Sequence, residues 1–245
     1  MTKFNIIKLD AIDSTNDYLK NKFHISDCND GDVIWTLNQT KGRGQRSNNW
    51  FSDPQKNITF SVFKRFLVLK SDQFFLINCS VTLAIVKFLE HFNIPDVKIK
   101  WPNDILSANK KIGGILIENF IKGGSLKGTI IGVGINVNQT SFINLPSASS
   151  MSLQCDKEFD LNLVFDKLLG TLNFFLKKLN NPNRNHLLNS FQKFIFKKGE
   201  WCQFKKNSIV FYGKIIGVNS NGKLLIQNKS CEVTQHSNGS IEMIY

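Results

Sequence analysis

The order of apolar patterns along the chain constrains its fold most strongly. Segments with period-two or β-branched character at residues 4–9, 31–37 and 57–66 predict strands, the last with one face buried and one exposed. Ser14 is a helix N-cap candidate, with Asp17 in a capping-box-like position. Helical periodicity over residues 74–92 predicts a long helix before Pro95. Strands and helices therefore alternate irregularly from the start of the chain.

The middle of the chain continues this mixture. A hairpin turn, Gly123-Gly124-Ser125, separates two of the expected strands, and Asn180-Asn181-Pro182-Asn183 separates two expected helices. The remaining predicted elements are strands at 97–101, 114–120 and 126–133 and helices at 161–179 and 185–196. This order predicts an α+β fold in which helices pack on a mixed sheet.

The pattern changes after Lys198-Gly199. Only short strands are expected beyond this point, at residues 201–204, 210–218, 223–227 and 232–235. Short, evenly spaced strands are typical of a small barrel. We therefore expect one domain at residues 1–196 and an SH3-like β-barrel at residues 197–245, joined by a short linker and packed together.

Composition narrows the class of protein. The chain has 245 residues, of which 42% are hydrophobic and 20% charged, as in an ordinary globular protein. Its five cysteines are widely spaced and odd in number, so neither a disulfide framework nor a zinc site is indicated. The first apolar run is too short for a secretion signal, and polar residues interrupt the others. We expect a cytoplasmic protein that does not associate with membranes.

The net charge of +12 arises from 31 Lys and Arg residues against 19 Asp and Glu residues. A basic protein suits nucleic acid, anionic substrates or acidic partners. The lysines are spread along the whole chain, without a run of like charges or a basic helix. A non-catalytic nucleic-acid-binding module is therefore an alternative that no motif supports.

A basic, glycine-rich loop follows the second expected strand. Over residues 39–50 it has the sequence Gln-Thr-Lys-Gly-Arg-Gly-Gln-Arg-Ser-Asn-Asn-Trp. Glycine lets the backbone approach a ligand or turn through positive φ. Guanidinium groups beside free backbone N–H groups suit an anion such as a phosphate or a carboxylate. Taken alone, the loop is equally compatible with a solvated surface turn.

Three further polar stretches fall between or at the ends of expected strands, where binding groups tend to lie. They are Ser14-Thr15-Asn16, then Lys100-Trp101-Pro102-Asn103-Asp104 with Lys110-Lys111-Ile112-Gly113-Gly114, and Gly132-Val133-Gly134-Ile135-Asn136-Val137-Asn138. Together with the glycine loop, and in this order, they resemble the biotin protein ligase family, also called holocarboxylase synthetases. The resemblance covers nearly the whole chain, and the combination of motifs is specific.

The resemblance implies a class II synthetase-like catalytic domain and a reaction in two steps. The biotin carboxylate attacks the α-phosphate of ATP, giving biotinyl-5′-AMP and pyrophosphate. A lysine amine of a biotin carboxyl carrier protein then attacks the mixed anhydride and releases AMP. Since both reactants of the first step are anions, cationic side chains and Mg²⁺ are needed to screen them. Candidate cations are Lys41, Arg43, Arg46, Lys100 and Lys111.

Roles for individual residues follow from the same resemblance. Arg43 is expected to act on the activated carboxylate, and Arg46 to reach phosphates. Ser14 can cap a helix and bind a ligand at once, because a hydroxyl both donates and accepts. The residues implied for biotin are Ser14, Thr15, Asn16, Gln39, Gly42, Gly44, Gly113 and Gly114, the last two leaving room for its ring beside the strand.

The remaining implied roles concern activation and ATP. Lys111 is the expected contact of both the biotin carboxylate and the α-phosphate. Trp50 is expected near the adenine, whereas Trp101 is expected to be structural. Asn103 and Asp104 would orient Mg²⁺–ATP or receive the acceptor lysine, with Asp104 and Asn136 as candidate metal ligands. A turn role is the simpler alternative for Asp104 and for Asn136.

The chain also departs from the family pattern. Gln45, Ser47 and Asn48 stand where the family often has arginine, glycine and arginine. A neutral Gln45 can hydrogen-bond a phosphate but cannot neutralise it, so we expect weaker retention of the adenylate. The loop is also expected to order over bound biotin. Only 13 residues precede Ser14, so we expect a short form without an N-terminal DNA-binding domain and without a DNA partner.

Two matters stay open at this stage. A lipoate or octanoate transferase is the related alternative, although its Arg-Arg-x-[Ser/Thr]-Gly-Gly-Gly loop is not present. The sequence does not identify the acceptor carboxylase subunit, and it does not distinguish a monomer from a homodimer.

Overall fold

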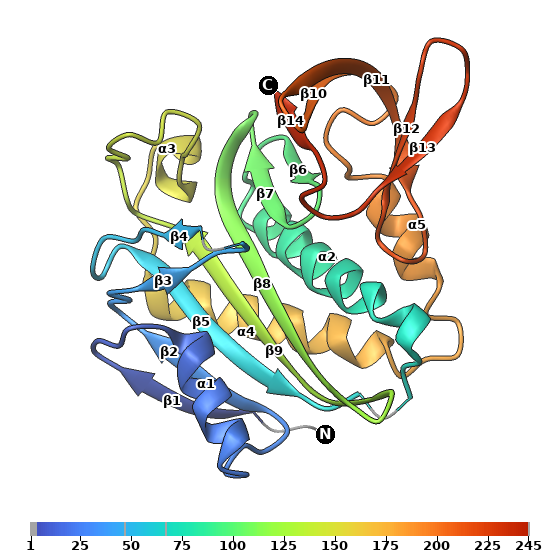
Figure 1. The fold of residues 1–245 in the computed structure, drawn as a ribbon. Coiled ribbons are helices and arrows are strands. Elements are labelled where there is room, and N and C mark those ends of the chain that lie inside the picture. Colours follow the sequence, from blue (N-terminus) through green and yellow to red (C-terminus); the bar gives the residue numbers. More distant parts are fainter. Residues whose placement is uncertain (1–3, 47, 67, 245) are drawn as a thin grey trace.

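The structure, a computed structural model, describes residues 4–46, 48–66 and 68–244. A seven-stranded mixed sheet forms the larger part, and a five-stranded antiparallel sheet follows it in the chain (Figure 1). The α+β prediction is confirmed, and the second sheet fits the predicted small SH3-like unit. We call the second sheet, with its turns, the C-terminal sheet.

The large sheet has the strand order β1-β2-β5-β9-β8-β7-β6. Only β1 and β2 pair in parallel, and every other neighbour is antiparallel. The strand β7 was not predicted, because its four residues follow the turn at Pro102 directly. The bounds are β1 Asn5–Leu9, β2 Asp32–Thr36, β5 Asn57–Lys64, β6 Val97–Lys100, β7 Asp104–Ser107, β8 Lys110–Lys122 and β9 Ser125–Asn136.

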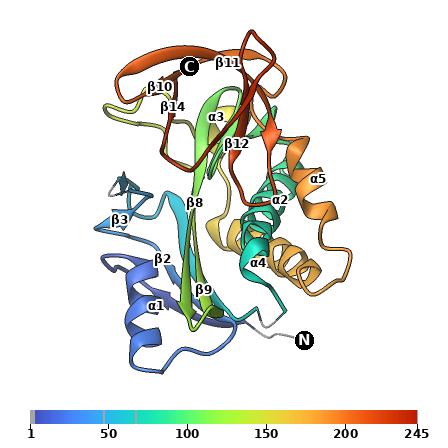
Figure 2. The same ribbon diagram turned by 45° about the vertical axis from the view of Figure 1, so that its right-hand side comes forward.

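Helices cover both faces of this sheet (Figure 2). The helix α1 (Thr15–His24) lies on one face, and α2 (Phe75–His91) and α4 (Leu161–Lys178) lie on the other. Because of this double cover, β5 is buried at every position. The prediction that one face of this strand is exposed was therefore wrong. The predicted cap is confirmed, since Ser14 Oγ accepts from the backbone N–H of Asp17 at 3.3 Å.

The segment that contains α2 is more apolar than its broken pattern indicated. Ser71–His91 is long and apolar enough to cross a membrane. However, 67% of its apolar 18-residue stretch is buried inside the fold. A short 3₁₀ turn, η1 (Ser71–Gln73), precedes the helix. The burial is that of a helix at the centre of a folded core.

The C-terminal sheet packs against the larger part. The indole N–H of Trp101 donates to the carbonyl of Gly222 at 2.9 Å, and Gln192 exchanges two hydrogen bonds with the backbone of Val218. The expectation that the two parts pack is thus confirmed. Its strands are β10 Trp201–Lys206, β11 Ile209–Val218, β12 Leu224–Gln227, β13 Val233–His236 and β14 Glu242–Ile244.

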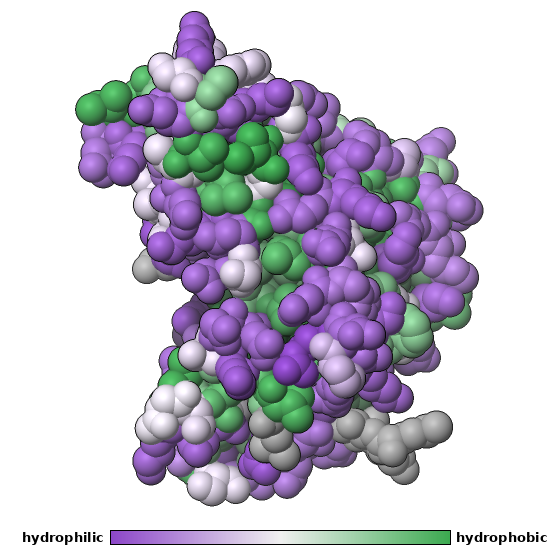
Figure 3. Space-filling view, turned by 90° about the vertical axis from the view of Figure 1, so that its right-hand side faces the viewer, coloured by the Kyte–Doolittle hydropathy of each residue, from purple (hydrophilic) through white to green (hydrophobic). Residues whose placement is uncertain are grey.

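Two short helices flank α4 in the chain: α3 (Met151–Cys155) precedes it, and α5 (His186–Gln192) lies between α4 and the C-terminal sheet. The helix α5 is shorter than predicted, and α3 was not predicted. In the space-filling view, apolar side chains gather on the upper part of the molecule, which the C-terminal sheet forms (Figure 3). Large exposed apolar side chains of this sheet include Ile209 and Tyr212.

An aromatic cluster joins α4 to the sheet. Phe165 stacks on Trp35 with ring centroids 4.0 Å apart, and it meets Phe60 edge-on at 5.4 Å. Its side chain is 1% exposed, whereas Phe174 of the same helix is 60% exposed. We expect Phe165→Ala to lower the free energy of unfolding by about 3–5 kcal/mol, because it leaves a cavity between α4 and β5.

Denaturant unfolding checks this expectation, with Phe174→Ala as the control for losing a phenylalanine from α4. The control is expected to change stability by less than about 1 kcal/mol, as an exposed position does. Equal losses in the two variants would contradict the packing described here.

Candidate active site

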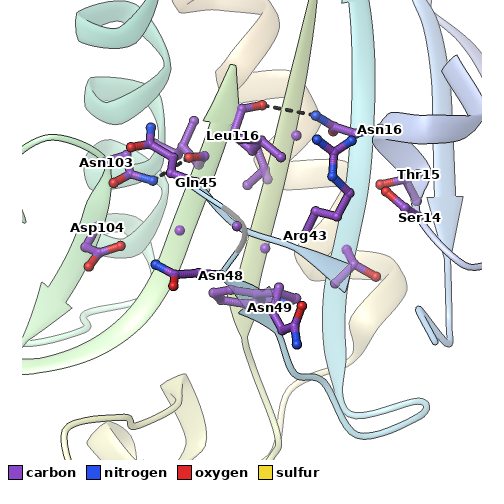
Figure 4. Close-up of a pocket in the computed structure, with 18 of the residues that line it drawn as sticks. Ser14, Thr15, Asn16, Arg43, Gln45, Asn48, Asn49, Asn103, Asp104 and Leu116 are labelled. Carbon is purple, nitrogen blue, oxygen red and sulfur yellow. Dashed lines mark hydrogen bonds between the residues drawn. The ribbon is translucent and has the colours of Figure 1, made fainter. Parts of the chain in front are cut away.

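A cavity of about 220 Å³ lies on the α1 face of the large sheet, beneath the glycine loop (Figure 4). Its walls come from the start of α1, the loop, the turn before β7, and strands β8 and β9. Most of the predicted site residues line it. They are Ser14, Thr15, Asn16, Gln39, Arg43, Gly44, Gln45, Arg46, Trp50, Asn103, Asp104, Lys111 and Gly114.

The glycine loop is a small β-hairpin rather than an irregular loop. Its strands are β3 (Gly42–Arg43) and β4 (Asn49–Trp50), and the N–H of Gly44 donates to the carbonyl of Asn48 at 2.7 Å. A Cβ at Gly42 would fall on the Trp50 carbonyl, so the two strands meet closely there. Ser47 lies outside the described residues. Two-residue strands are too short for a sequence pattern to reveal.

A hydrogen-bonded network forms one end of the cavity. Gln39 Oε1 accepts from the backbone N–H and the hydroxyl of Thr15, at 2.9 and 3.1 Å. The Thr15 hydroxyl lies 2.7 Å from Ser61 Oγ, which donates to Asn16 Oδ1. Asn16 Nδ2 in turn donates to Glu118 Oε2 at 2.8 Å. These groups thus offer both donors and acceptors to one end of the cavity.

The glycine at position 132 makes this network possible. A Cβ there would fall on the Asn16 amide. The missing side chain therefore lets Asn16 lie against the backbone of β9. Asn16 is 4% exposed and also donates to the carbonyl of Leu116 at 3.4 Å (Figure 4). Gly132 belongs to one of the motifs of the sequence, but the motif assigns it no role, and no sequence pattern indicated Ser61 or Glu118.

Trp50 lies over glycines of the two central strands. A Cβ at Gly134 would stand 2.5 Å from the indole ring, and one at Gly114 would stand 3.1 Å from it. Gly113 faces the opposite way, where a Cβ would meet Ile135 Cδ1 at 2.7 Å. Gly113 therefore faces the core. Of the two glycines expected to leave room for a ligand ring, Gly114 lines the cavity, next to the indole of Trp50.

A lysine–carboxylate pair forms the other end of the cavity. Lys111 Nζ lies 2.7 Å from Asp104 Oδ1 and 5.7 Å from the centre of the Trp50 ring. The Asn103 side chain holds the turn, since its Nδ2 donates to the carbonyl of Ile115 at 2.7 Å. The structure thus brings the predicted Lys111, Asp104 and Trp50 together.

Arg43 projects from the hairpin toward α1 and β8. Its guanidinium pairs with Asp17 and, at 3.4 Å, with Glu118. Burial acts to lower the pKa of Arg43, but the charges of Glu118 and Asp17 outweigh it and raise the pKa, so the cation is fixed. Lys41 lies elsewhere, exposed and paired with Asp13 at 2.8 Å. Of these two loop cations, only Arg43 lines the cavity.

A second cavity of about 560 Å³ opens between the large sheet and the C-terminal sheet. It contains the predicted cation Lys100, whose pKa is lowered chiefly by burial. Arg46 and Asn238 line both this cavity and the first one. Arg46 donates to backbone carbonyls of the C-terminal sheet at residues 238 and 239. Its expected contact with phosphates stays a prediction.

Asn136 lines a third cavity, of about 260 Å³, together with Trp50 and Lys111. Its Nδ2 donates to the carbonyl of Ser149 at 2.9 Å, while its Oδ1 is buried without a hydrogen-bond partner among the described residues. In residues 4–46, 48–66 and 68–244, no three His, Cys, Asp or Glu side chains gather to hold a metal ion. The two predicted metal ligands line different cavities, since Asp104 lines the first and the second cavity and Asn136 lines the third.

Comparison with known proteins adds to this geometry. The family model described as Biotin/lipoate A/B protein ligase family matches residues 9–136. The Bifunctional ligase/repressor BirA of Bacillus spizizenii is 28% identical over 241 residues, which cover 92% of this chain and 70% of that protein. The structure of a biotin protein ligase from Aquifex aeolicus in complex with biotin and ATP superimposes with a TM-score of 0.80 at 25% identity, over 98% of both chains.

Other relatives are matched over less of their length. The Bifunctional ligase/repressor BirA of Escherichia coli is 35% identical over 135 residues, 54% of this chain and 40% of that protein. The alignment with its counterpart in Salmonella typhimurium covers 41% of that protein. The alignments therefore span about two fifths of the length of these two relatives.

The close approach of Trp50 to the sheet can be tested directly. We expect Gly134→Ala to lower the free energy of unfolding by about 1–3 kcal/mol, because the new methyl group forces the indole outward. Gly170→Ala on α4 is the matched control, since a Cβ there meets nothing within 4 Å. It is expected to stabilise the helix by about 0.5–1 kcal/mol.

Urea unfolding of both variants provides the measurement, with tryptophan emission followed in parallel. A Gly134→Ala protein as stable as the wild type, with unchanged emission, would show that Trp50 does not lie against β9 at Gly134.

Proposed function

We propose that this chain, which belongs to the biotin/lipoate A/B protein ligase family, is an ATP-dependent biotin protein ligase. The observation that carries the proposal is the two-ended cavity, with a donor–acceptor network at Thr15, Asn16 and Gln39 and a lysine at position 111 at the other end. Relatives named as biotin ligases support the same activity. The substrates would be biotin, ATP and a lysine of a carrier protein.

The polar end suits the ureido ring of biotin, which presents two N–H donors and one carbonyl acceptor. In the structure, Thr15 hydrogen-bonds Gln39 directly and Asn16 through the hydroxyl of Ser61. A ligand with both donors and acceptors can replace these internal bonds without stranding a buried group, which a purely apolar ligand cannot do. Ser14 Oγ, already the cap of α1, has a second lone pair for the ring.

The opposite end suits the reacting groups. Biotin carboxylate and the α-phosphate repel each other, and a cation between them lowers that barrier. Lys111 is held at this end by Asp104, so its amine is already oriented toward the cavity. Attack on phosphorus forms the carboxyl–phosphate bond and breaks the bond to pyrophosphate. Arg43, fixed by Asp17 and Glu118, would cover the activated carboxylate.

The third cavity suits the adenine of ATP. Its lining includes Trp50, Phe142, Asn136 and residues 144–148, and an aromatic plane favours stacking with a base. Mg²⁺ would enter with the nucleotide and would use phosphate and water oxygens besides those of Asp104 and Asn136. The ion would screen phosphate charge when bound.

The second step and its setting complete the proposal. The amine of a carrier lysine would attack the mixed anhydride, forming the amide and releasing AMP. The partner would be a biotin carboxyl carrier protein or domain, as the name of the biotin–[acetyl-CoA-carboxylase] ligase of Mycobacterium tuberculosis supports. We also propose a cytoplasmic location, a catalytic domain at residues 1–196, a barrel at residues 197–245, and a monomer or homodimer without DNA as partner.

The activation step can be tested by biotin-dependent exchange of labelled pyrophosphate into ATP. We expect Lys111→Ala to reduce exchange by about 10²–10³-fold, because it removes the cation that stabilises the charged transition state. Lys110→Ala is the matched control, since this neighbouring lysine is exposed and does not line the cavity.

No exchange with biotin in the wild type would remove this function. Exchange with lipoate in place of biotin would assign the chain to the other branch of the family. Exchange that survives in Lys111→Ala would keep the activity but overturn the role of the lysine.

The polar end calls for a separate measurement of biotin affinity. We expect Asn16→Ala to raise the Kd for biotin by about tenfold, the equivalent of one buried hydrogen bond. Asn21→Ala, an exposed position of the same helix, is expected to leave the Kd unchanged. Titration calorimetry would check both, and equal affinities in the two variants would exclude Asn16 from the biotin site.

A further inference from the structure

The tip of the glycine-loop hairpin is tied to a turn of the C-terminal sheet. Asn238 Nδ2 donates to Gln45 Oε1 at 2.6 Å. Arg46 Nη2 donates to the carbonyl of Asn238 at 2.7 Å, and Arg46 Nη1 donates to the carbonyl of Gly239. Side chains and backbone of two parts of the fold therefore interlock above the cavity. We call residues 45–46 together with residues 237–240 the clasp.

Local hydrogen bonds and a glycine give the turn the shape that this contact needs. The N–H and hydroxyl of Ser240 both donate to the carbonyl of Ser237, at 3.0 and 2.8 Å. Gly239 has a φ of +66°, and a Cβ there would fall on the guanidinium of Arg46. Only glycine gives both the left-handed backbone and the space that this arginine fills.

The hairpin has two anchors of different kinds. Its base is held within the larger part of the fold, where the N–H groups of Thr40 and Lys41 donate to the carbonyls of Ile12 and Asp13 at 2.9 and 2.8 Å. Its tip is held by the C-terminal sheet through the clasp. Loss of the tip anchor alone would leave the base attached and let the hairpin swing away from the cavity.

We infer that Asn238 is a positioning residue, which holds the hairpin closed through Gln45 while its carbonyl holds Arg46. Gln45 is then an acceptor between two parts of the fold, in a place where the family pattern often has an arginine. An arginine could not accept this bond, because a guanidinium has donors only. That closure also retains the activated intermediate is a consequence that rests on the proposed function.

Limited trypsin digestion of the ligand-free protein tests the closure. Trypsin cuts after Arg43 and Arg46, and a bound hairpin must open to enter the protease. We expect Asn238→Ala to raise the rate of cleavage at these sites by about tenfold, since tenfold corresponds to the loss of one good hydrogen bond. Asn238→Asp is expected to restore protection, because Gln45 can turn its amide and donate to the carboxylate.

Matched variants separate closure from general damage to the C-terminal sheet. Asn228→Ala removes an asparagine whose amide donates to Glu232 within another turn of the sheet. Gly199→Ala imposes the same kind of backbone strain as Gly239→Ala, since its φ is +86°, but a Cβ there meets nothing within 4 Å. We expect faster cleavage in Asn238→Ala and Gly239→Ala and wild-type cleavage in the two controls.

A second experiment measures the rate at which bound biotinyl-5′-AMP dissociates from the protein. Dissociation is expected to be several-fold faster in Asn238→Ala, with a Kd for biotin that changes less than the dissociation rate of the adenylate. Unchanged digestion in Asn238→Ala would overturn the clasp whatever the activity. Faster digestion in a protein that shows no exchange with biotin would leave the clasp standing and remove the proposed function.

Discussion

The strip of bare backbone on β8 and β9 is the constraint on which the site depends. Gly114 pairs with Gly134 across the two strands, and Gly132 lies two residues before Gly134 on β9. Without Cβ atoms on this strip, Asn16 can reach the sheet from α1 and the Trp50 ring can lie against it from the hairpin. A methyl group at any of these positions would lift one wall of the cavity from its floor.

The long elements were predictable because their patterns are long. The helices α2 and α4 each carry several turns of apolar periodicity, and tertiary packing preserved both. Strands β3, β4 and β14 have only two or three residues, which is too few for any periodicity. Strand β7 is as long as the predicted β6, but it follows the turn at Pro102 directly and was missed for that reason. The full burial of β5 was not predictable from its own residues, since it follows from helices on both faces of the sheet.

The candidate site shows the same division. Motifs indicated Lys111, Asp104 and Arg43, and the fold gathers them around one cavity. The motifs did not indicate which groups pair with them, because Arg43 meets Glu118 across 75 residues of chain. Asn238 belongs to no motif and lies in a turn whose sequence is ordinary, so nothing but the folded arrangement reveals its contact with Gln45.

The contact between Gln45 and Asn238 joins positions 193 residues apart. A contact between positions so far apart closes a very long loop, and it can form only where the C-terminal sheet is folded and packed against the larger part. The cover of the cavity therefore depends on the assembly of both parts of the fold, although the cavity itself is built almost entirely from the first of them.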